Sequence, residues 1–231
     1  MNKLISVKNL RKSFGFFKPN LVLEDINFDV YAGDSFGISG ANGAGKTVLL
    51  HILLGIVLPD SGEIKIFGKD LFKNLKFIRS KINYASPYDS LFQQATLMDN
   101  LTTFANLYGI DDKKRKIEEI LSILNLKDHA TNQLLESFSD GMRAKAILSK
   151  ALINDAEILL LDEPFASLDF QSKKSFSEYL LYSNKKEKKT IIITSHNFED
   201  IKNFCNRMIF LDKGKIIFEG KVEDIPKKLL S

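Results

Sequence analysis

The chain has 231 residues, 44% of them hydrophobic, which is enough to bury a substantial core in one domain and argues against disorder. Its 33 basic and 29 acidic residues leave a net charge of +4, a balance too even to indicate a nucleic-acid-binding surface. The single cysteine, Cys205, excludes an internal disulfide and favours a reducing cytosol.

Membrane-directed segments are not evident in the sequence. The first ten residues lack the charged segment and apolar core of a secretory signal. The longest apolar stretch, residues 48–58, contains His51 and Gly55 and is much shorter than the ~20 residues of a membrane-spanning helix. We therefore expect a cytoplasmic chain that does not span a membrane by itself.

The N-terminal third of the chain predicts strands followed by one helix. Residues 4–7 and 22–31 alternate apolar and polar side chains, which is typical of a half-exposed antiparallel hairpin and predicts a separate β-layer. Residues 35–39 predict a short strand that leads into a glycine-rich turn. Residues 46–55 predict an apolar helix that ends at a glycine.

The rest of the chain changes character twice. From about residue 88 to 135 glycines almost vanish, and helical spacing at 97–108 and 113–124 predicts a helical insertion. Strand patterns return at 158–161, 190–194, 207–211 and 216–219, separated by helical segments. This alternation predicts an α/β fold with a mostly parallel sheet covered on both faces. Because no repeat or linker divides the chain, we expect one domain, 1–231, with segments 1–87, 88–140 and 141–231.

A glycine-rich segment, Gly40-Ala-Asn-Gly-Ala-Gly-Lys-Thr47, lies between the predicted strand and helix. Its spacing is that of a P-loop, in which glycines let successive backbone N–H groups face one anion at the positive end of a helix. Lys46 adds a charge for the β- and γ-phosphates, and the Thr47 hydroxyl is a ligand for Mg²⁺. The predicted nucleotide-binding residues of this segment are Gly40, Asn42, Gly43, Ala44, Gly45, Lys46, Thr47 and Val48.

Two adjacent carboxylates, Asp162 and Glu163, follow an apolar strand pattern and precede Pro164. Neighbouring residues at a strand end point in different directions, so Asp162 is predicted to reach the metal while Glu163 faces a water in line with the γ-phosphate. A carboxylate at that place can polarise or deprotonate the attacking water. We therefore predict Glu163 as the catalytic base and Lys46 as a further catalytic residue.

Further motifs follow in the order of ATP-binding cassette (ABC) ATPases, a family that the chain resembles over almost its full length. The resemblance includes the run 58–64 after the P-loop helix. The motif residues are Phe14-Gly15, similar to the aromatic that stacks on adenine; Phe138-Ser-Asp-Gly-Met142, similar to the signature motif; Ser167-Leu-Asp169, similar to the D-loop; and His196, similar to the switch histidine. The helix after the signature motif is expected to place Ala144, Ile147, Leu148 and Ala151 on one apolar face.

The resemblance implies a P-loop NTPase core with an N-terminal antiparallel β-subdomain and an inserted helical subdomain. It implies an ATPase that uses ATP and Mg²⁺, with His196 as a catalytic residue. Two cassettes would pack head to tail, so that Ser139 and Gly141 of one bind the ATP held by the other and Asp169 couples the two sites. The implied partners are a second cassette and transmembrane permease subunits at the inner face of the cell membrane. No nucleic-acid partner is expected.

The sequence departs from the family pattern at two places. Pro87 stands where the family carries a glutamine that touches Mg²⁺ or water, and Gln93 and Gln94 are candidates to replace it through a longer loop. In the signature motif Asp140 replaces a glycine and Met142 a glutamine. A carboxylate 4 Å from a phosphate charge is repulsive by about 1 kcal/mol in water, so Asp140 has to point away or weaken ATP binding.

Three functions stay open from the sequence. The first is the ATP-hydrolysing subunit of a membrane transporter, with a lean towards export because a signature motif ending in Gly-Met resembles those of some polysaccharide exporters. The second is a soluble ABC ATPase that acts on ribosomes or DNA, although such relatives usually fuse two cassettes or insert a coiled coil. The third is a catalytically weak regulatory cassette in a heterodimer. The transported substrate cannot be inferred, since its choice lies mainly in membrane subunits.

Overall fold

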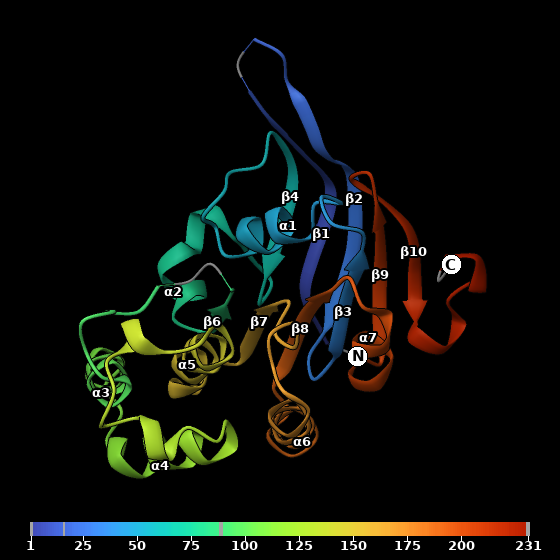
Figure 1. Cartoon of the computed structure of the whole chain (residues 1–231). Coiled ribbons are helices and arrows are strands. Elements are labelled where there is room, and N and C mark those ends of the chain that lie inside the picture. Colours follow the sequence, from blue (N-terminus) through green and yellow to red (C-terminus); the bar gives the residue numbers. More distant parts are fainter. Residues whose placement is uncertain (1, 16, 88–89, 230–231) are drawn as a thin grey trace.

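The strands of the computed structural model form two sheets, and the structure describes residues 2–15, 17–87 and 90–229 (Figure 1). The smaller sheet is antiparallel, with strand order β2-β1-β4-β5. Its strands are β1 (Lys3–Phe14), β2 (Asn20–Tyr31), β4 (Ser61–Ile66) and β5 (Lys69–Asp70). The predicted β-layer is therefore present. Its first two strands are longer than the sequence pattern indicated, because register shifts between β1 and β2 interrupt the alternation of apolar and polar residues.

The larger sheet has strand order β10-β9-β3-β8-β7-β6 and is parallel except for β10, which pairs antiparallel with β9 at one edge. Its strands are β3 (Ser35–Gly40), β6 (Ile82–Ala85), β7 (Ile158–Asp162), β8 (Thr190–Ser195), β9 (Arg207–Asp212) and β10 (Lys215–Lys221). The predicted α/β fold class is confirmed. Because β3, β8 and β7 are neighbours, the loops after their carboxyl ends meet at one edge of the sheet.

Helices cover the larger sheet on both faces, and its strands divide their side chains between two cores. Leu160 and Ile192 face a core shared with α1 and the antiparallel sheet, whereas Leu161 and Ile193 face a core shared with the remaining large helices. Burying each such side chain contributes roughly 1.5–3 kcal/mol. The helices are α1 (Lys46–Leu53), α2 (Leu75–Arg79), α3 (Leu97–Leu107), α4 (Lys113–Ile123), α5 (Asp140–Ile153), α6 (Phe170–Glu187) and α7 (Phe198–Phe204). Over the described residues, none is both long and apolar enough to cross a bilayer.

The predicted helical insertion corresponds to α3 and α4, which pack against α5. α3 begins with a capping box, in which the Thr96 side chain and the Asp99 side chain each accept a hydrogen bond from the other residue's backbone N–H. Such reciprocal capping satisfies two N–H groups that a helix start leaves without partners. Both helices begin where the sequence pattern predicted. The predicted boundary at residue 88 lies outside the described residues, and the division into three segments stays a prediction.

The environment of α5 differs from the expected single apolar face. Ile147, Leu148 and Ala151 are buried and Ala144 is partly buried, so the predicted apolar face is present, but it is not the only covered side of the helix. Burial also extends to Lys145 and to other residues around the helix. The reason is that α5 lies between the helical segment and strand β6, so neighbours cover it on more than one side.

Candidate functional site

The glycine-rich loop after β3 has a backbone that requires glycine. Gly40, Gly43 and Gly45 have φ angles of 148°, 80° and 105°. A Cβ atom on Gly40 would lie 2.2 Å from the carbonyl oxygen of Leu211, so no side chain fits there. Gly45 is the N-cap of α1, which places the positive end of that helix at the loop. The predicted P-loop is therefore a backbone arrangement able to bind an anion.

Lys46, the first residue of α1, is held above this loop. Its side chain is 6% exposed, and its Nζ donates hydrogen bonds to the carbonyl oxygens of Gly40 at 2.7 Å and Ala41 at 3.2 Å. Nζ also lies 3.5 Å from Oε1 of Glu163. A buried ammonium requires such partners, because an unpaired buried charge is costly. The positive charge is thus fixed between the loop and a carboxylate.

Asp162, the last residue of β7, contacts Thr47, the other residue that the sequence predicts to bind the metal. Its Oδ2 accepts a hydrogen bond from Thr47 Oγ1 at 2.7 Å, and its Oδ1 accepts one from Thr194 Oγ1 at 2.5 Å. A carboxylate beside hydroxyl oxygens is the kind of donor set that Mg²⁺ prefers. The sequence analysis missed Thr194. A hydroxyl residue at the end of an apolar strand, two residues before His196, was the available signal.

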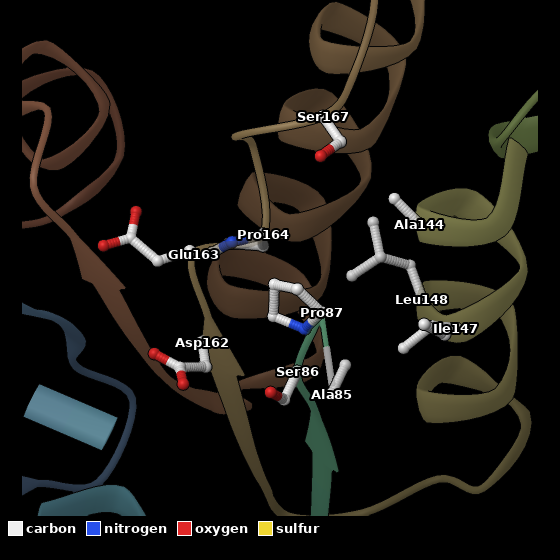
Figure 2. A pocket seen from close by; sticks show the side chains of 10 residues that line it. All are labelled: Ala85, Ser86, Pro87, Ala144, Ile147, Leu148, Asp162, Glu163, Pro164 and Ser167. Carbon is white, nitrogen blue, oxygen red and sulfur yellow. The ribbon is translucent and has the colours of Figure 1, made fainter. Parts of the chain in front are cut away.

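Glu163 adopts a backbone conformation that is uncommon for a residue with a side chain. Its φ is +48°, in the left-handed region, and its N–H donates to Thr194 Oγ1 at 3.0 Å. Strain of this kind costs roughly 1–3 kcal/mol and is concentrated at functional sites. Oε1 accepts a hydrogen bond from the His196 backbone N–H at 3.0 Å, and Oε2 lies 2.9 Å from His196 Nδ1. Figure 2 shows that the carboxylates of Asp162 and Glu163 both point away from α5.

An open cleft of about 560 Å³ joins these groups and is large enough for a small-molecule ligand. The predicted residues Gly40 and Ala44 are buried under the loop and do not line it. Val22 of β2 does, although an apolar residue in a strand gave no sequence signal for this role. The lining residues are Val22, Asn42, Gly43, Gly45, Lys46, Thr47, Val48, Pro87, Asp162 and Glu163.

Two further predictions can be compared with this cleft: that Phe14 stacks on the base, and that Gln93 or Gln94 replaces the glutamine missing at Pro87. Phe14, the last residue of β1, is 43% exposed, and Lys12 Nζ lies 4.9 Å from its ring centroid, but Phe14 is not among the described residues that line the cleft. Pro87 does line it. Gln93 donates from its side chain to the Leu91 carbonyl at 3.2 Å, and neither it nor Gln94 belongs to the described lining. This arrangement argues against either glutamine replacing the one that the family carries.

A smaller crevice of about 20 Å³ separates the cleft from α5 (Figure 2). In Figure 2 Pro87 lies between Pro164 on one side and Leu148 of α5 on the other. The walls are mostly apolar, and the exposed Pro87 lines both this crevice and the cleft at the place where the family has a polar side chain. The crevice is lined by Ala85, Ser86, Pro87, Ala144, Ile147, Leu148, Asp162, Glu163, Pro164 and Ser167.

The residues of the signature motif lie at the start of α5. Ser139 is the N-cap, and its Oγ accepts a hydrogen bond from the Met142 N–H at 3.3 Å. Ser139 and Asp140 are exposed, whereas a Cβ atom on Gly141 would lie 3.2 Å from the Ser167 carbonyl oxygen. The first turn of α5 therefore packs against the D-loop. The signature residues Ser139, Asp140, Gly141 and Met142 are not among the described residues that line the cleft.

Asp169 of the D-loop makes its contacts within this chain. It is the N-cap of α6 and accepts hydrogen bonds from the Ser172 N–H and hydroxyl at 2.9 and 2.8 Å. Lys145 Nζ lies 2.7 Å from its Oδ2, and this ammonium, together with Ser172, holds the pKa of Asp169 well below its usual range. The sequence analysis missed Lys145. A charged residue within the buried stretch of a helix was the signal that could have found it.

Comparison with known proteins matches the sequence to one family. Residues 23–166 match the family described as ABC transporter. The Nod factor export ATP-binding protein I of Rhizobium sp. (strain N33) is 34% identical over 218 residues, which cover 94% of this chain and 70% of that protein. The bacitracin transport ATP-binding protein BcrA of Bacillus licheniformis is 34% identical over 229 residues, covering 99% of this chain and 73% of that protein.

Solved structures give the same result for the fold. An ATP-binding subunit of an ABC transporter superposes with a TM-score of 0.85 at 26% identity, covering 97% of this chain and 92% of that one. A dimeric ATP-binding cassette in a post-hydrolysis state, bound to ADP and Pi, has a TM-score of 0.87 at 22% identity, covering 96% of this chain and all of that one.

Proposed function

Because the chain belongs to the ABC transporter family, we propose that its cleft binds ATP with Mg²⁺ and that Glu163 activates the water that attacks the γ-phosphate. The protein is an ATP-binding subunit of an ABC transporter and an ATPase. This confirms the family and the function that the sequence predicted.

The phosphates of ATP bind at the P-loop. Gly43 and Gly45 line the cleft at the N-terminal end of α1, which favours negative charge. Lys46 exchanges its bonds to the Gly40 and Ala41 carbonyls for phosphate oxygens, so its burial is compensated in both states. Phe14, exposed at the end of β1, supplies the aromatic ring for the adenine base.

Thr47 and Asp162 fit a magnesium ion. The Thr47 hydroxyl and the Asp162 carboxylate are hard oxygen donors 2.7 Å apart at the floor of the cleft, and Thr194 fixes the other carboxylate oxygen. When bound there, the ion neutralises charge on the β- and γ-phosphate oxygens.

One observation carries the catalytic proposal: the Glu163 carboxylate is fixed at the cleft by two contacts with His196 and lies 3.5 Å from Lys46. A general base has to be held within reach of its water before the reaction, and this arrangement does so. Glu163 accepts the proton of the attacking water. His196 positions Glu163 and contacts the γ-phosphate.

The signature residues act on a second cassette. Ser139, Gly141 and Asp169 are not among the described residues that line the cleft of their own chain, and Ser139 and Asp140 at the start of α5 are exposed. A second cassette packed head to tail would receive this helix start as a further anion site. The dimer would be closed by ATP and opened after hydrolysis, which moves transmembrane permease subunits at the inner face of the membrane.

Export is the direction that we propose, because the relatives include a Nod factor export protein. The alternative of a weak regulatory cassette predicts a different result for one experiment. The Glu163→Gln variant is expected to lose at least about 100-fold of the ATPase rate while still binding ATP, because only the proton acceptor is removed.

The matched control is Glu199→Gln, which makes the same change at an exposed glutamate of α7. It should hydrolyse ATP at the unchanged rate. An ATPase rate that survives Glu163→Gln would contradict the catalytic assignment. A wild-type protein that binds ATP without hydrolysing it, even with its membrane subunits present, would favour the regulatory alternative.

A further inference from the structure

Basic and apolar side chains occur together on the outer face of α2. Residues 69–81 contain five basic residues and one acidic residue, so this segment alone carries as much net positive charge as the whole chain. In the 3-10 turn Phe72–Asn74 and in α2, helical spacing places Lys73, Lys76 and Phe77 on the exposed side, while Ile78 is fully buried on the other. The amphipathic character is thus a property of the folded segment.

The apolar part of this face extends to the loop after α1. Phe77 is 44% exposed, and Lys69 Nζ lies 5.5 Å from its ring centroid. Ile56 and Leu58 are 61% and 66% exposed. Arg79 connects the two segments, because its guanidinium donates to the carbonyl oxygens of Leu54 at 3.0 Å and Gly55 at 2.8 Å. We call the surface formed by Ile56, Leu58, Lys69, Lys73, Lys76 and Phe77 the α2 patch.

The lysines of the α2 patch are not neutralised by the fold. Within the described parts of the chain, Lys69, Lys73 and Lys76 form no ion pair. The nearby carboxylate of Asp70 accepts a hydrogen bond from the Lys73 N–H and so serves to cap the turn. Lys189 near the end of α6 differs, since it is paired with both Asp155 and Glu187.

We propose that the α2 patch binds the surface of an anionic membrane. Unpaired lysines gain energy near anionic headgroups, and long lysine stems lie along apolar surface while their ammonium groups stay in water. An exposed phenylalanine with neighbouring aliphatic residues can enter the boundary between headgroups and acyl chains. Figure 1 shows α2 at the flank of the molecule, well separated from α6. Lipid contact there would hold the chain to the bilayer in addition to any contact with permease subunits.

The test is sedimentation of the purified full chain with vesicles of phosphatidylcholine alone or mixed with phosphatidylglycerol, at low and high salt. Binding is expected only with phosphatidylglycerol and should weaken with salt. Lys73→Glu/Lys76→Glu should weaken it about tenfold or more, since two attractive charges become repulsive. Phe77→Ser should weaken binding at every salt concentration, because it removes apolar contact and no charge.

The control is Lys185→Glu/Lys186→Glu, an equal charge change at exposed lysines in the last turn of α6. It should bind vesicles like the wild type. Thermal melting verifies that each variant is folded, and Lys73→Gln/Lys76→Gln replaces the first variant if that one is unfolded. The proposal is overturned if the wild type does not sediment with anionic vesicles, which would leave the patch to a protein partner. It is also overturned if the control variant loses as much binding as the α2 variant.

Discussion

Residues predicted to contact the nucleotide lie in two regions, the cleft and the starts of α5 and α6. The two regions differ in how firmly the rest of the chain holds these residues in place. In the cleft, Lys46, Asp162 and Glu163 are mostly buried, and each is fixed by partners from distant parts of the sequence. At the helix starts, Ser139 and Asp169 are both exposed, and both cap their own helices. Preorganised groups can act at once on a ligand, whereas exposed ones need another surface to exclude water. One chain therefore contains a nearly complete phosphate site and half of a second contact surface.

Lys46→Ala should have the largest effect on the cleft. Removing a buried ammonium that contacts phosphate is expected to weaken ATP binding about 100-fold, since truncating one partner of a buried charge pair typically costs about 2–5 kcal/mol. Calorimetric titration with ATP measures this. Lys185→Ala, at an exposed site on α6, is the control and should bind ATP normally. Equal affinity of Lys46→Ala and wild type would show that the cleft is not the phosphate site.

Lys145→Met tests the link between α5 and α6. The substitution keeps the length of the buried side chain but leaves Asp169 without its cation, and we expect a loss of about 1 kcal/mol, because Asp169 is largely exposed to solvent. The folded-state pKa of Asp169 is lowered, so the stabilisation is fully present above the unfolded-state pKa near 3.9. It is lost as the pH falls through the folded-state value.

Urea unfolding of wild type and Lys145→Met at several pH values measures this difference. The difference should be constant between about pH 5 and 8 and should shrink below about pH 4. Lys145→Arg, which keeps the charge, should restore most of the stability. A difference that instead grows on acidification would mean that the pair does not carry the effect.

Asp140→Gly should have the smallest effect and sharpens the comparison. Asp140 is exposed in the first turn of α5, where a carboxylate favours the helix but repels phosphate. We expect a loss of stability of about 0.5 kcal/mol together with a severalfold gain in ATPase rate. Thermal melting and phosphate release measure the two effects. An unchanged rate would indicate that Asp140 points away from bound ATP in the dimer.

The sequence predicted the features that depend on neighbouring residues. The P-loop, the strand before Asp162 and the helices at 97–107 and 113–123 follow from local spacing, and the structure has them there. Contacts that depend on tertiary packing could not be predicted. Thr194 meets Asp162 only because β7 and β8 are neighbours in the sheet. Lys145 is buried against Asp169 because the start of α5 packs against the loop that leads into α6, and no periodicity indicates this.

The central claim, that a second cassette completes the ATP site of this chain, is tested most directly by the oligomeric state of Glu163→Gln. Light scattering of this variant with Mg²⁺ and ATP, compared with a nucleotide-free sample, should show a monomer that becomes a dimer only with ATP. Since the variant binds ATP without consuming it, the closed dimer should persist. A protein that binds ATP and stays monomeric would contradict the claim for this chain alone and would point to a different partner cassette.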